Sequence, residues 1–316
     1  MSDDPQFLPN GLVTSPKGFI AGAAYAGIKT YARDKMDVGV LLSEHPCVTA
    51  GVYTRNKFVS PSVTLTRDHV QAGRVRGAFV SSGIANAGVG EQGMLDAKES
   101  LEIAAKHIGV DPEELGIGTT GVIGVELPMA LIRSGVPNIV LTSEGGDAFA
   151  RAIMTTDRVP KSVAISFECG GHEVTIGGCV KGSGMIHPNM ATMLAYLTTD
   201  AVLERSFLDT VLAETSDDTF NMVTIDGDTS TNDTVMLFAN GAAGNDEIHS
   251  ETPDAHVFKQ ALRSVCDHLS RSLVRDAEGS AKVFSVRVEQ ALTREDARLA
   301  ARAVAASSLV KSAIHG

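Results

Sequence analysis

Residues 181–194 read KGSGMIHPNMATML, and the interpretation of the whole chain starts from this stretch. Glycines and a proline precede the Ala191–Thr192 bond, and an apolar strand is predicted to begin just after it, at Met193. If that bond broke, Thr192 would become an N-terminal residue. Its freed α-amine, which titrates at about pH 8, could take the proton of its own hydroxyl, so that one residue would supply both nucleophile and base.

Local sequence alone leaves three interpretations of this segment open. Gly182-Ser183-Gly184 has the small residues of a phosphate loop, but the Walker pattern is absent and no helix is predicted to follow. The segment is equally compatible with an ordinary loop that enters a strand. The third interpretation is a strained turn that cleaves itself, because Pro188 fixes its own φ and restricts the residue before it. Such strain would help the Thr192 hydroxyl to attack the Ala191 carbonyl in an N→O acyl shift that water then resolves.

Composition narrows the class of protein. With 316 residues, 43% hydrophobic and 21% charged, the chain can bury a large core. Its net charge of −11 and lack of a basic run argue against a nucleic-acid partner. No run of 18 apolar residues predicts a membrane span, and the acidic start Met1–Pro5 lacks the apolar core of a secretory signal. We therefore expect a cytoplasmic protein without a membrane partner.

The cysteines and histidines predict neither disulfides nor a metal site. The four cysteines are widely separated and form no CxxC pair, which is typical of free thiols in a reducing compartment. The nine histidines are dispersed as well. We expect no bound metal.

The pattern of strands and helices predicts a layered α/β fold rather than strict βαβ winding. Helices are expected at 95–108 (ending at Gly109), 144–154, 204–216, from Pro253 onward and from Thr293, which Asp296 would cap. A hairpin is expected from 162–167 and 173–180, with a turn at Gly170 and Gly171. Further strands are expected at 38–42 and 48–53 as neighbours, and at 77–81, 193–197, 234–238, 282–288 and 308–314.

Four segments outside 181–194 carry polar groups of interest. Thr119–Gly124 would present a hydroxyl and a backbone N–H to one point, as an oxyanion needs, or would be a simple glycine turn. Thr155-Thr156-Asp157 closes a helix, where hydroxyls usually bond to the backbone. Residues 224–234 suggest a hydrogen-bonded loop at a polar cleft more than a calcium loop, since the EF-hand spacing is missing. Glu278 either faces solvent or points from a helix-to-strand turn into a pocket.

Taken in order, these segments resemble a known family. GTTGVIG (118–124), AIMTTD (152–157), KGSGM (181–185) with PNMATML (188–194), DGDTSTNDT (226–234) and RDAEG (275–279) are similar to the motifs of the ornithine acetyltransferase family (ArgJ, glutamate N-acetyltransferase). The similarity extends from about Thr14 to Gly316. It implies a layered αββα-type fold of the ArgJ and N-terminal-nucleophile aminopeptidase group.

The resemblance implies an acetyltransferase of arginine biosynthesis. Family members cut themselves at the bond matched by Ala191–Thr192, so residues 1–191 would form an α chain and residues 192–316 a β chain. The two chains stay together, in an expected heterotetramer of two α and two β. Thr192 would then take acetyl from N2-acetylornithine and pass it to glutamate by a ping-pong mechanism. Some members also use acetyl-CoA as donor, and no cofactor is expected.

The resemblance also assigns roles to single residues. Thr192 matches the nucleophile, and Thr120 and Gly121 match the pair that stabilises the oxyanion. Thr155, Lys181, Thr192 and Glu278 match positions that contact substrate. Family members continue beyond the position of Gly316, so the chain is expected to lack a C-terminal segment that contacts substrate.

Two other functional hypotheses remain. An amidohydrolase or aminopeptidase of the N-terminal-nucleophile group would pass the acyl group to water instead of glutamate. A truncated homologue would fold but be inactive.

Overall fold

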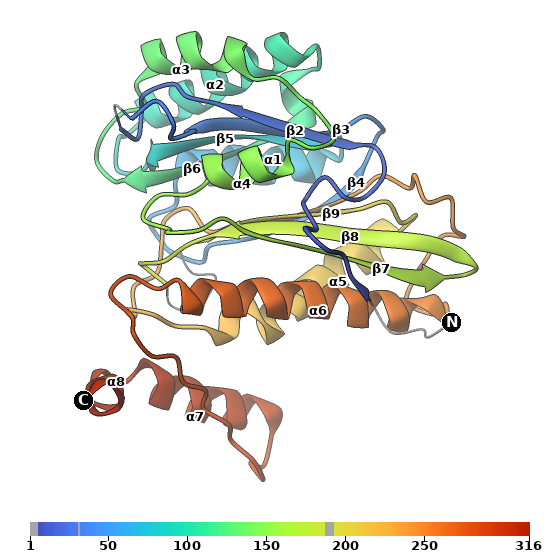
Figure 1. The fold of residues 1–316 in the computed structure, drawn as a ribbon, viewed down its shortest axis with the longest axis vertical. Helices are drawn as coiled ribbons and strands as arrows, with labels where there is room; N and C mark the ends of the chain where they lie inside the picture. Colours follow the sequence, from blue (N-terminus) through green and yellow to red (C-terminus); the bar gives the residue numbers. More distant parts are fainter. Residues whose placement is uncertain (1–5, 31, 187–192) are drawn as a thin grey trace.

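The computed structural model describes residues 6–30, 32–186 and 193–316. Figure 1 shows four stacked layers, with two sheets in the middle and helices outside each of them. This arrangement confirms the layered αββα class. The four-stranded sheet has the order β2 (Phe19–Ala24), β3 (Val38–Ser43), β5 (Gly77–Ile84), β6 (Leu115–Val122). The six-stranded sheet has the order β1 (Gln6–Phe7), β7 (Lys161–Cys169), β8 (His172–Lys181), β9 (Leu194–Thr199), β10 (Thr234–Ala239), β4 (Val48–Tyr53).

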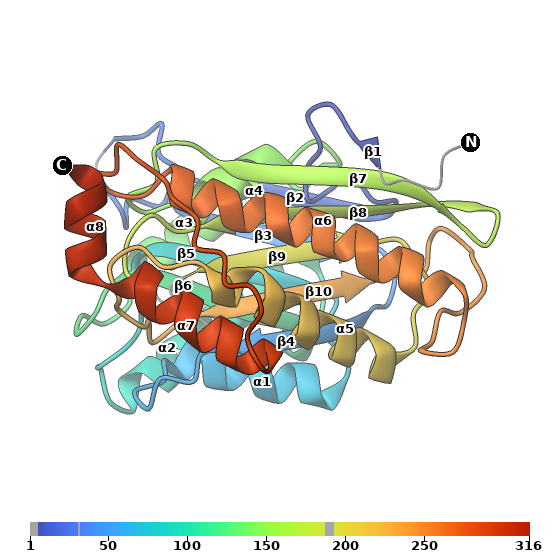
Figure 2. The ribbon, with the colours of Figure 1, turned by 90° about the horizontal axis from the view of Figure 1, so that it is seen from below.

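Helices cover the outer face of each sheet. The four-stranded sheet is covered by α2 (Gln92–Ile108) and α3 (Met129–Gly135), and the six-stranded sheet by α5 (Arg205–Asp218) and α6 (Asp254–Arg275). Two further helices, α1 (Pro61–Ala72) and α4 (Gly146–Ala152), each contact strands of both sheets and lie between them (Figure 1). The last helices, α7 (Arg294–Ala306) and α8 (Ser308–His315), lie outside α5 and α6 on the side away from the sheets (Figure 1), and Figure 2 views the molecule from that side.

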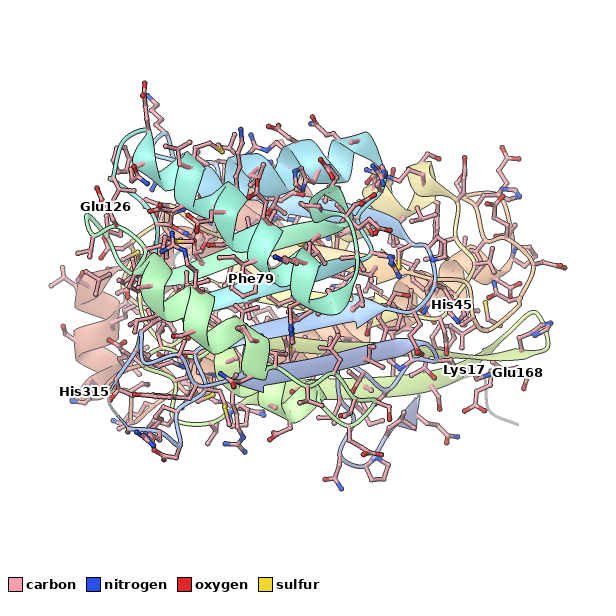
Figure 3. All side chains as sticks on the ribbon, turned by 90° about the horizontal axis from the view of Figure 1, so that it is seen from above. Lys17, His45, Phe79, Glu126, Glu168 and His315 are labelled. Atoms are coloured by element: carbon pink, nitrogen blue, oxygen red, sulfur yellow. The ribbon has the colours of Figure 1, made fainter. Side chains whose placement is uncertain are left out.

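Strand alternation divides the core into three layers. Successive side chains of a strand point to opposite faces, so each central strand feeds two different cores. In β9, Ala195 and Leu197 pack toward α5 and α6, whereas Leu194 and Tyr196 pack toward the other sheet. A third core lies under α2 and α3 and contains the fully buried Phe79. Figure 3 shows Phe79 inside the molecule, whereas Glu126 lies at its periphery.

Several predicted elements are confirmed. The β7–β8 hairpin turns at Gly170 and Gly171, whose φ angles of +59° and +77° favour glycine. Helix α2 ends at Gly109 with φ +77°. Thr293 caps α7, because its Oγ1 accepts a hydrogen bond of 3.1 Å from the Asp296 N–H.

The prediction that strands 38–42 and 48–53 are neighbours was wrong. β3 pairs with β2 and β5 in one sheet, whereas β4 pairs with β10 in the other. The turn at His45-Pro46 therefore carries the chain across the intersheet layer instead of closing a hairpin. All six residues of β3 are buried because both of its faces are covered, and such a continuous apolar run does not reveal its partners.

The two strand predictions near the C-terminus were also wrong. Residues 282–288 form no strand, and residues 308–314 lie in helix α8 instead of a strand. Ser307 caps α8 through its Oγ, which accepts from the Val310 N–H at 3.4 Å, and a short apolar run does not by periodicity alone distinguish helix from strand. Strands β2 and β6 and helices α1 and α3 were missed. Within the described ranges, no helix is both long enough and apolar enough to cross a membrane.

Candidate active site

The two sheets contribute one residue each to a buried contact at the centre of the candidate site. Thr120 lies near the end of β6 and Lys181 is the last residue of β8. The Lys181 Nζ donates a hydrogen bond of 2.9 Å to the Thr120 Oγ1. Thr120 is 4% exposed and Lys181 is 3% exposed. The structure thus brings together two residues that are 61 positions apart in the sequence.

Gly121 follows Thr120 in a conformation that only glycine adopts easily. Its φ is +130°, and it pairs with Gly83 of β5, whose φ is +122°. A Cβ at Gly121 would lie 2.2 Å from the carbonyl carbon of Gly83. The segment was predicted as a turn, but it is the irregular end of a strand. A threonine hydroxyl next to this exposed backbone has the donor types that an oxyanion site requires.

Asn232 holds the end of β6 in place. Its Nδ2 lies 2.9 Å from the Thr119 carbonyl oxygen, 3.0 Å from the Thr119 Oγ1 and 2.6 Å from the Ala85 carbonyl oxygen. Asn232 is buried and belongs to the 224–234 segment, which is hydrogen-bonded as expected. Because the amide group donates to both β6 and the chain after β5, it fixes the backbone that carries Thr120.

Burial lowers the pKa of Lys181, since removing an ammonium from water disfavours its charged form. Asp157 and Asp233 act in the opposite direction and favour the charged form, as does Glu278, whereas Lys161 opposes it. Lys181, which contacts Thr120, therefore interacts electrostatically with three carboxyl groups and with one other lysine.

Asp157 connects Thr155 to the end of β8. Its Oδ2 accepts a hydrogen bond of 3.1 Å from the Thr155 N–H, and its Oδ1 accepts one of 2.7 Å from the Gly182 N–H. Burial alone would raise the pKa of Asp157, but Lys181 and Lys161 outweigh it and the pKa is lowered. Asp157 is therefore a carboxylate at neutral pH.

Asp233 is a second buried carboxyl group, and it lies next to the start of β9. Its Oδ1 accepts a hydrogen bond of 2.9 Å from the Met193 N–H. Its Oδ2 has no hydrogen-bond partner among the described residues. Burial raises the pKa of Asp233 well above its ordinary value. This carboxyl group holds the amide of the residue that follows Thr192 in the sequence.

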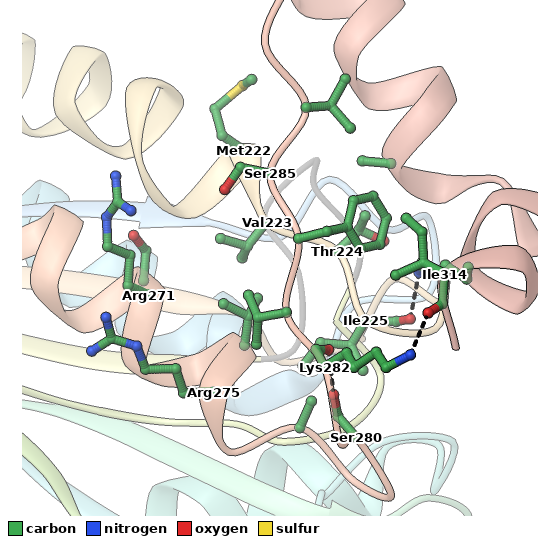
Figure 4. Close-up of a pocket in the computed structure, with 18 of the residues that line it drawn as sticks. Met222, Val223, Thr224, Ile225, Arg271, Arg275, Ser280, Lys282, Ser285 and Ile314 are labelled. Atoms are coloured by element: carbon green, nitrogen blue, oxygen red, sulfur yellow. Dashed lines mark hydrogen bonds between the residues drawn. The ribbon is translucent and has the colours of Figure 1, made fainter. Parts of the chain in front are cut away.

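Glu278 joins the site through the glycine-rich loop. Its backbone N–H donates to the Ser183 carbonyl oxygen at 2.8 Å. Its carboxylate lies against Gly184, where an added Cβ would be 2.9–3.0 Å from the carboxyl atoms. Glu278 is exposed and lines a cavity of about 640 Å³ between α6, the 281–286 segment and the two last helices (Figure 4). Thr120 and Lys181 do not line that cavity, so we place the candidate chemistry at their contact and not in the cavity.

The structure brings some of the predicted site residues into direct contact and connects others only through intermediate residues. Lys181 contacts Thr120 directly, while Thr155 and Glu278 are connected to the end of β8 through Asp157 and Ser183. The Ala191–Thr192 bond lies outside the described residues. Asp157 and Asp233 belong to the same sequence motifs, but the sequence predicted no role for either of them. The described part of the chain contains no cluster of histidine, cysteine, aspartate or glutamate suited to a metal.

The four-layer αββα fold places a Thr–Gly pair beside a buried lysine, and these are the donor types that an acyl-transferring enzyme needs. In agreement on the fold alone, the chain is similar to the L-aminopeptidase D-Ala-esterase/amidase of Ochrobactrum anthropi, with 14% identity, a TM-score of 0.50 and coverage of 89% of this chain and 90% of that one.

Sequence comparison identifies the family. The ArgJ family model matches residues 20–316, and the chain belongs to this family. It is 49% identical to the arginine biosynthesis bifunctional protein ArgJ of Symbiobacterium thermophilum, over 97% of this chain and 77% of the relative. It is 45% identical to the protein of the same name from Dehalococcoides mccartyi, over 100% of this chain and 78% of the relative. The chain is thus an acyltransferase of arginine biosynthesis.

A solved family member supports the same assignment. The ornithine acetyltransferase of Mycobacterium tuberculosis, in complex with ornithine, is 34% identical with a TM-score of 0.53. The match covers 59% of this chain and 99% of that one.

Proposed function

We propose that the chain cleaves itself between Ala191 and Thr192 and then transfers an acetyl group from N2-acetylornithine to glutamate through an ester on Thr192. The observation that carries this proposal is the hydrogen bond of 2.9 Å from the Lys181 Nζ to the Thr120 Oγ1.

That hydrogen bond defines what Thr120 can do. The Lys181 Nζ donates this hydrogen bond, so the Thr120 oxygen accepts it. The hydroxyl proton of Thr120 is then directed elsewhere and is available to an oxygen that gains negative charge. Together with the Gly121 N–H, it would stabilise the tetrahedral intermediates of acyl transfer.

The reaction divides into two similar steps. The Thr192 Oγ attacks the acetyl carbonyl carbon, the amide C–N bond breaks, and the hydroxyl proton passes through the Thr192 α-amine to the leaving amine of ornithine. Glutamate then attacks the ester with its own amine. The Thr192 Oγ regains its proton, and N-acetylglutamate leaves.

Local charges suit two amino-acid substrates. The chain carries a net charge of −11, which would repel glutamate, so a buried cation such as Lys181 is needed near its carboxylate. Glu278 would bind a substrate ammonium, and Thr155, whose N–H donates to Asp157, would also contact substrate. The solved relative in complex with ornithine supports this choice of substrate.

Self-cleavage would leave two pieces that remain in one sheet. β8 ends at Lys181 and β9 begins at Leu194, and these two residues are paired in antiparallel register. β9 and β10 of the second piece lie between β8 and β4 of the first. The pieces would therefore be held by hydrogen bonds on both sides. The solved Mycobacterium tuberculosis chain matches 59% of this one, or about 186 of 316 residues, which is close to the 191 residues expected for the first piece.

Three finer points of the proposal rest on the family resemblance. Two copies of each piece would assemble into a heterotetramer, and acetyl-CoA would serve as an additional acetyl donor. The enzyme would need no cofactor.

Intact mass and product analysis test the proposal together. Cleavage predicts pieces of 191 and 125 residues, and Thr192→Ala should give one uncut chain. Cleaved protein incubated with N-acetylornithine and glutamate should form N-acetylglutamate. Free acetate formed equally fast without glutamate would instead indicate a hydrolase, and cleaved protein that forms neither product would refute acetyl transfer.

A further inference from the structure

A buried ion-pair network connects the two sides of the candidate site. At its centre, the Lys161 Nζ lies 2.6 Å from the Asp157 Oδ1 and 2.6 Å from the Asp276 Oδ2. The side chains are 2%, 0% and 6% exposed, respectively. Lys161 begins β7 and Asp276 follows α6, so the ammonium joins a strand to the helix layer beneath it.

Each carboxylate that Lys161 contacts is tied to residues of the site. Asp157 accepts from the backbone of Thr155 and Gly182, the latter adjacent to Lys181. Asp276 lies two residues before Glu278, in a short turn after α6. Asp157, Lys161 and Asp276 thus connect the Lys181 end of β8 to the turn that carries Glu278.

The path matters because of where the proposed cut falls. Asp157, Lys161 and Lys181 precede residue 191, whereas Asp276 and Glu278 follow residue 192. Once the chain is cut, the relative position of Lys181 and Glu278 depends on noncovalent contacts. The described contacts that join these two regions include Lys161 with Asp276, Arg158 with Asp276, and the Glu278 N–H with the Ser183 carbonyl oxygen.

Of the two ion pairs to Asp276, that of Lys161 is the better placed to be rigid. Arg158 donates to the same Asp276 at 3.1 Å, but its side chain is 65% exposed, and exposed ion pairs contribute little. Lys161 is buried and satisfies two carboxylates at once, so removing its charge would leave both without their shared partner.

We propose that Lys161 is a positioning residue that sets the separation between Lys181 and Glu278, and with it the affinity for the amino-acid substrate. This inference rests on the proposed function, because the separation matters only if both side chains bind the same substrate. Lys161 itself does not touch the substrate.

The test compares Lys161→Met with two matched variants. Lys161→Arg keeps a cation that can pair with both carboxylates, and Arg158→Ala removes the exposed partner of the same Asp276. For each protein we would measure the melting temperature, the extent of cleavage by intact mass, and kcat and KM for N-acetylornithine well below the melting temperature.

We expect Lys161→Met to be cleaved and to raise KM at least about tenfold, with a smaller change in kcat. Arg158→Ala should stay within about twofold of the unchanged protein, and Lys161→Arg should recover most of the lost affinity. A purely structural role would lower the melting temperature and the active fraction but leave KM unchanged, and that result would overturn the inference.

A second variant covers the case in which Lys161→Met does not fold. Asp276→Asn keeps the side-chain volume and an oxygen acceptor but removes the charge that faces Lys161. It should raise KM in the same direction, and an unchanged KM would overturn the inference. If the unchanged protein is cleaved but transfers no acetyl group, the proposed function fails instead. Calorimetric titration with ornithine then tests Lys161 separately, and equal affinity in the unchanged protein and the variant would overturn its role.

Discussion

The Lys181 Nζ and the Thr120 Oγ1 are 2.9 Å apart although their strands belong to different sheets. β8 lies inside the six-stranded sheet and β6 at the edge of the four-stranded sheet, so the contact crosses the intersheet layer where the two strands end. The candidate site therefore depends on how the two sheets are stacked. Buried side chains between the sheets fix that stacking, and through it they fix the distance from the lysine to the hydroxyl.

Removing the ammonium of Lys181 should abolish most of the activity. Lys181→Met keeps an unbranched side chain of similar length but leaves Thr120 without its donor. We expect kcat/KM to fall at least about 100-fold, the magnitude typical of losing an oxyanion-stabilising group. Lys106→Met, on the exposed face of α2, serves as the control and should retain full activity. Activity within a few-fold of the control in a folded, cleaved variant would contradict a role for Lys181.

Gly121 should tolerate no side chain. In Gly121→Ala the new Cβ would meet the Gly83 carbonyl carbon at 2.2 Å, and the φ of +130° would be strained. Gly124→Ala is the matched control, because its φ is +83° but no atom lies within 4 Å of the added Cβ. We expect Gly121→Ala to lose at least about 2 kcal/mol more of unfolding free energy than the control. Urea unfolding of both variants measures the difference, and equal losses would show that the overlap is relieved without cost.

The sequence predicted the layered fold well where local signals were strong. The 162–180 hairpin and the long helix after Pro253 follow from glycine turns and from side-chain periodicity, which act within a few residues. The separation of β3 from β4 was not predictable in this way. It is decided by pairing with β10, whose residues lie more than 180 positions away, and a buried strand carries no mark of its partner.

The candidate site shows the same limit. The family motifs selected Thr120, Lys181 and Glu278, but nothing in the sequence indicated that Lys181 would contact Thr120 directly. Asp157 and Lys161 are only four residues apart, yet their common link to Asp276 depends on how α6 packs beneath β7. Buried charge networks arise from tertiary packing, so their members look like ordinary polar residues in a sequence.

The pH dependence of stability should reveal the environment of Lys29. Its Nζ donates to the Met154 carbonyl oxygen at 2.6 Å, and burial lowers its pKa from 10.5 to about 8, although Asp37 and Asp157 favour the charged form. Between these two values the unfolded chain binds more protons at this residue than the folded one. The contribution of Lys29 to the free energy of unfolding should therefore increase as the pH rises from about 8 toward 10.5.

Urea unfolding at pH 7.5 and pH 9.5 measures this contribution. Because other groups titrate in the same range, the informative quantity is the difference between variants. Lys29→Met should show a smaller rise in stability with pH than the unchanged protein, whereas Lys98→Met, at an exposed position on α2, should keep the full rise. If the free energy of unfolding rose equally with pH in both variants, Lys29 would be solvated in the folded protein.

Tyr196 and Gly118 should be energetically coupled across the intersheet layer. A Cβ at Gly118 would lie 2.0 Å from the Tyr196 Oη but 3.3 Å from its Cζ, so the hydroxyl causes the severe overlap. That hydroxyl is buried without a partner among the described residues, and burying an unpaired hydroxyl costs about 1–3 kcal/mol. Tyr196→Phe alone should thus be neutral or stabilising.

Gly118→Ala alone should destabilise by at least about 2 kcal/mol, because the clash must be relieved by moving the sheets. In the double variant the ring Cζ would lie 3.3 Å from the new methyl group, a tight contact but a much smaller overlap, so the combined loss should be smaller than the sum of the single effects by at least about 1 kcal/mol. A double-mutant cycle from urea unfolding gives this coupling energy directly. Additive effects would mean that the Tyr196 hydroxyl does not face Gly118, and the intersheet spacing that positions Lys181 near Thr120 would then be set by other residues.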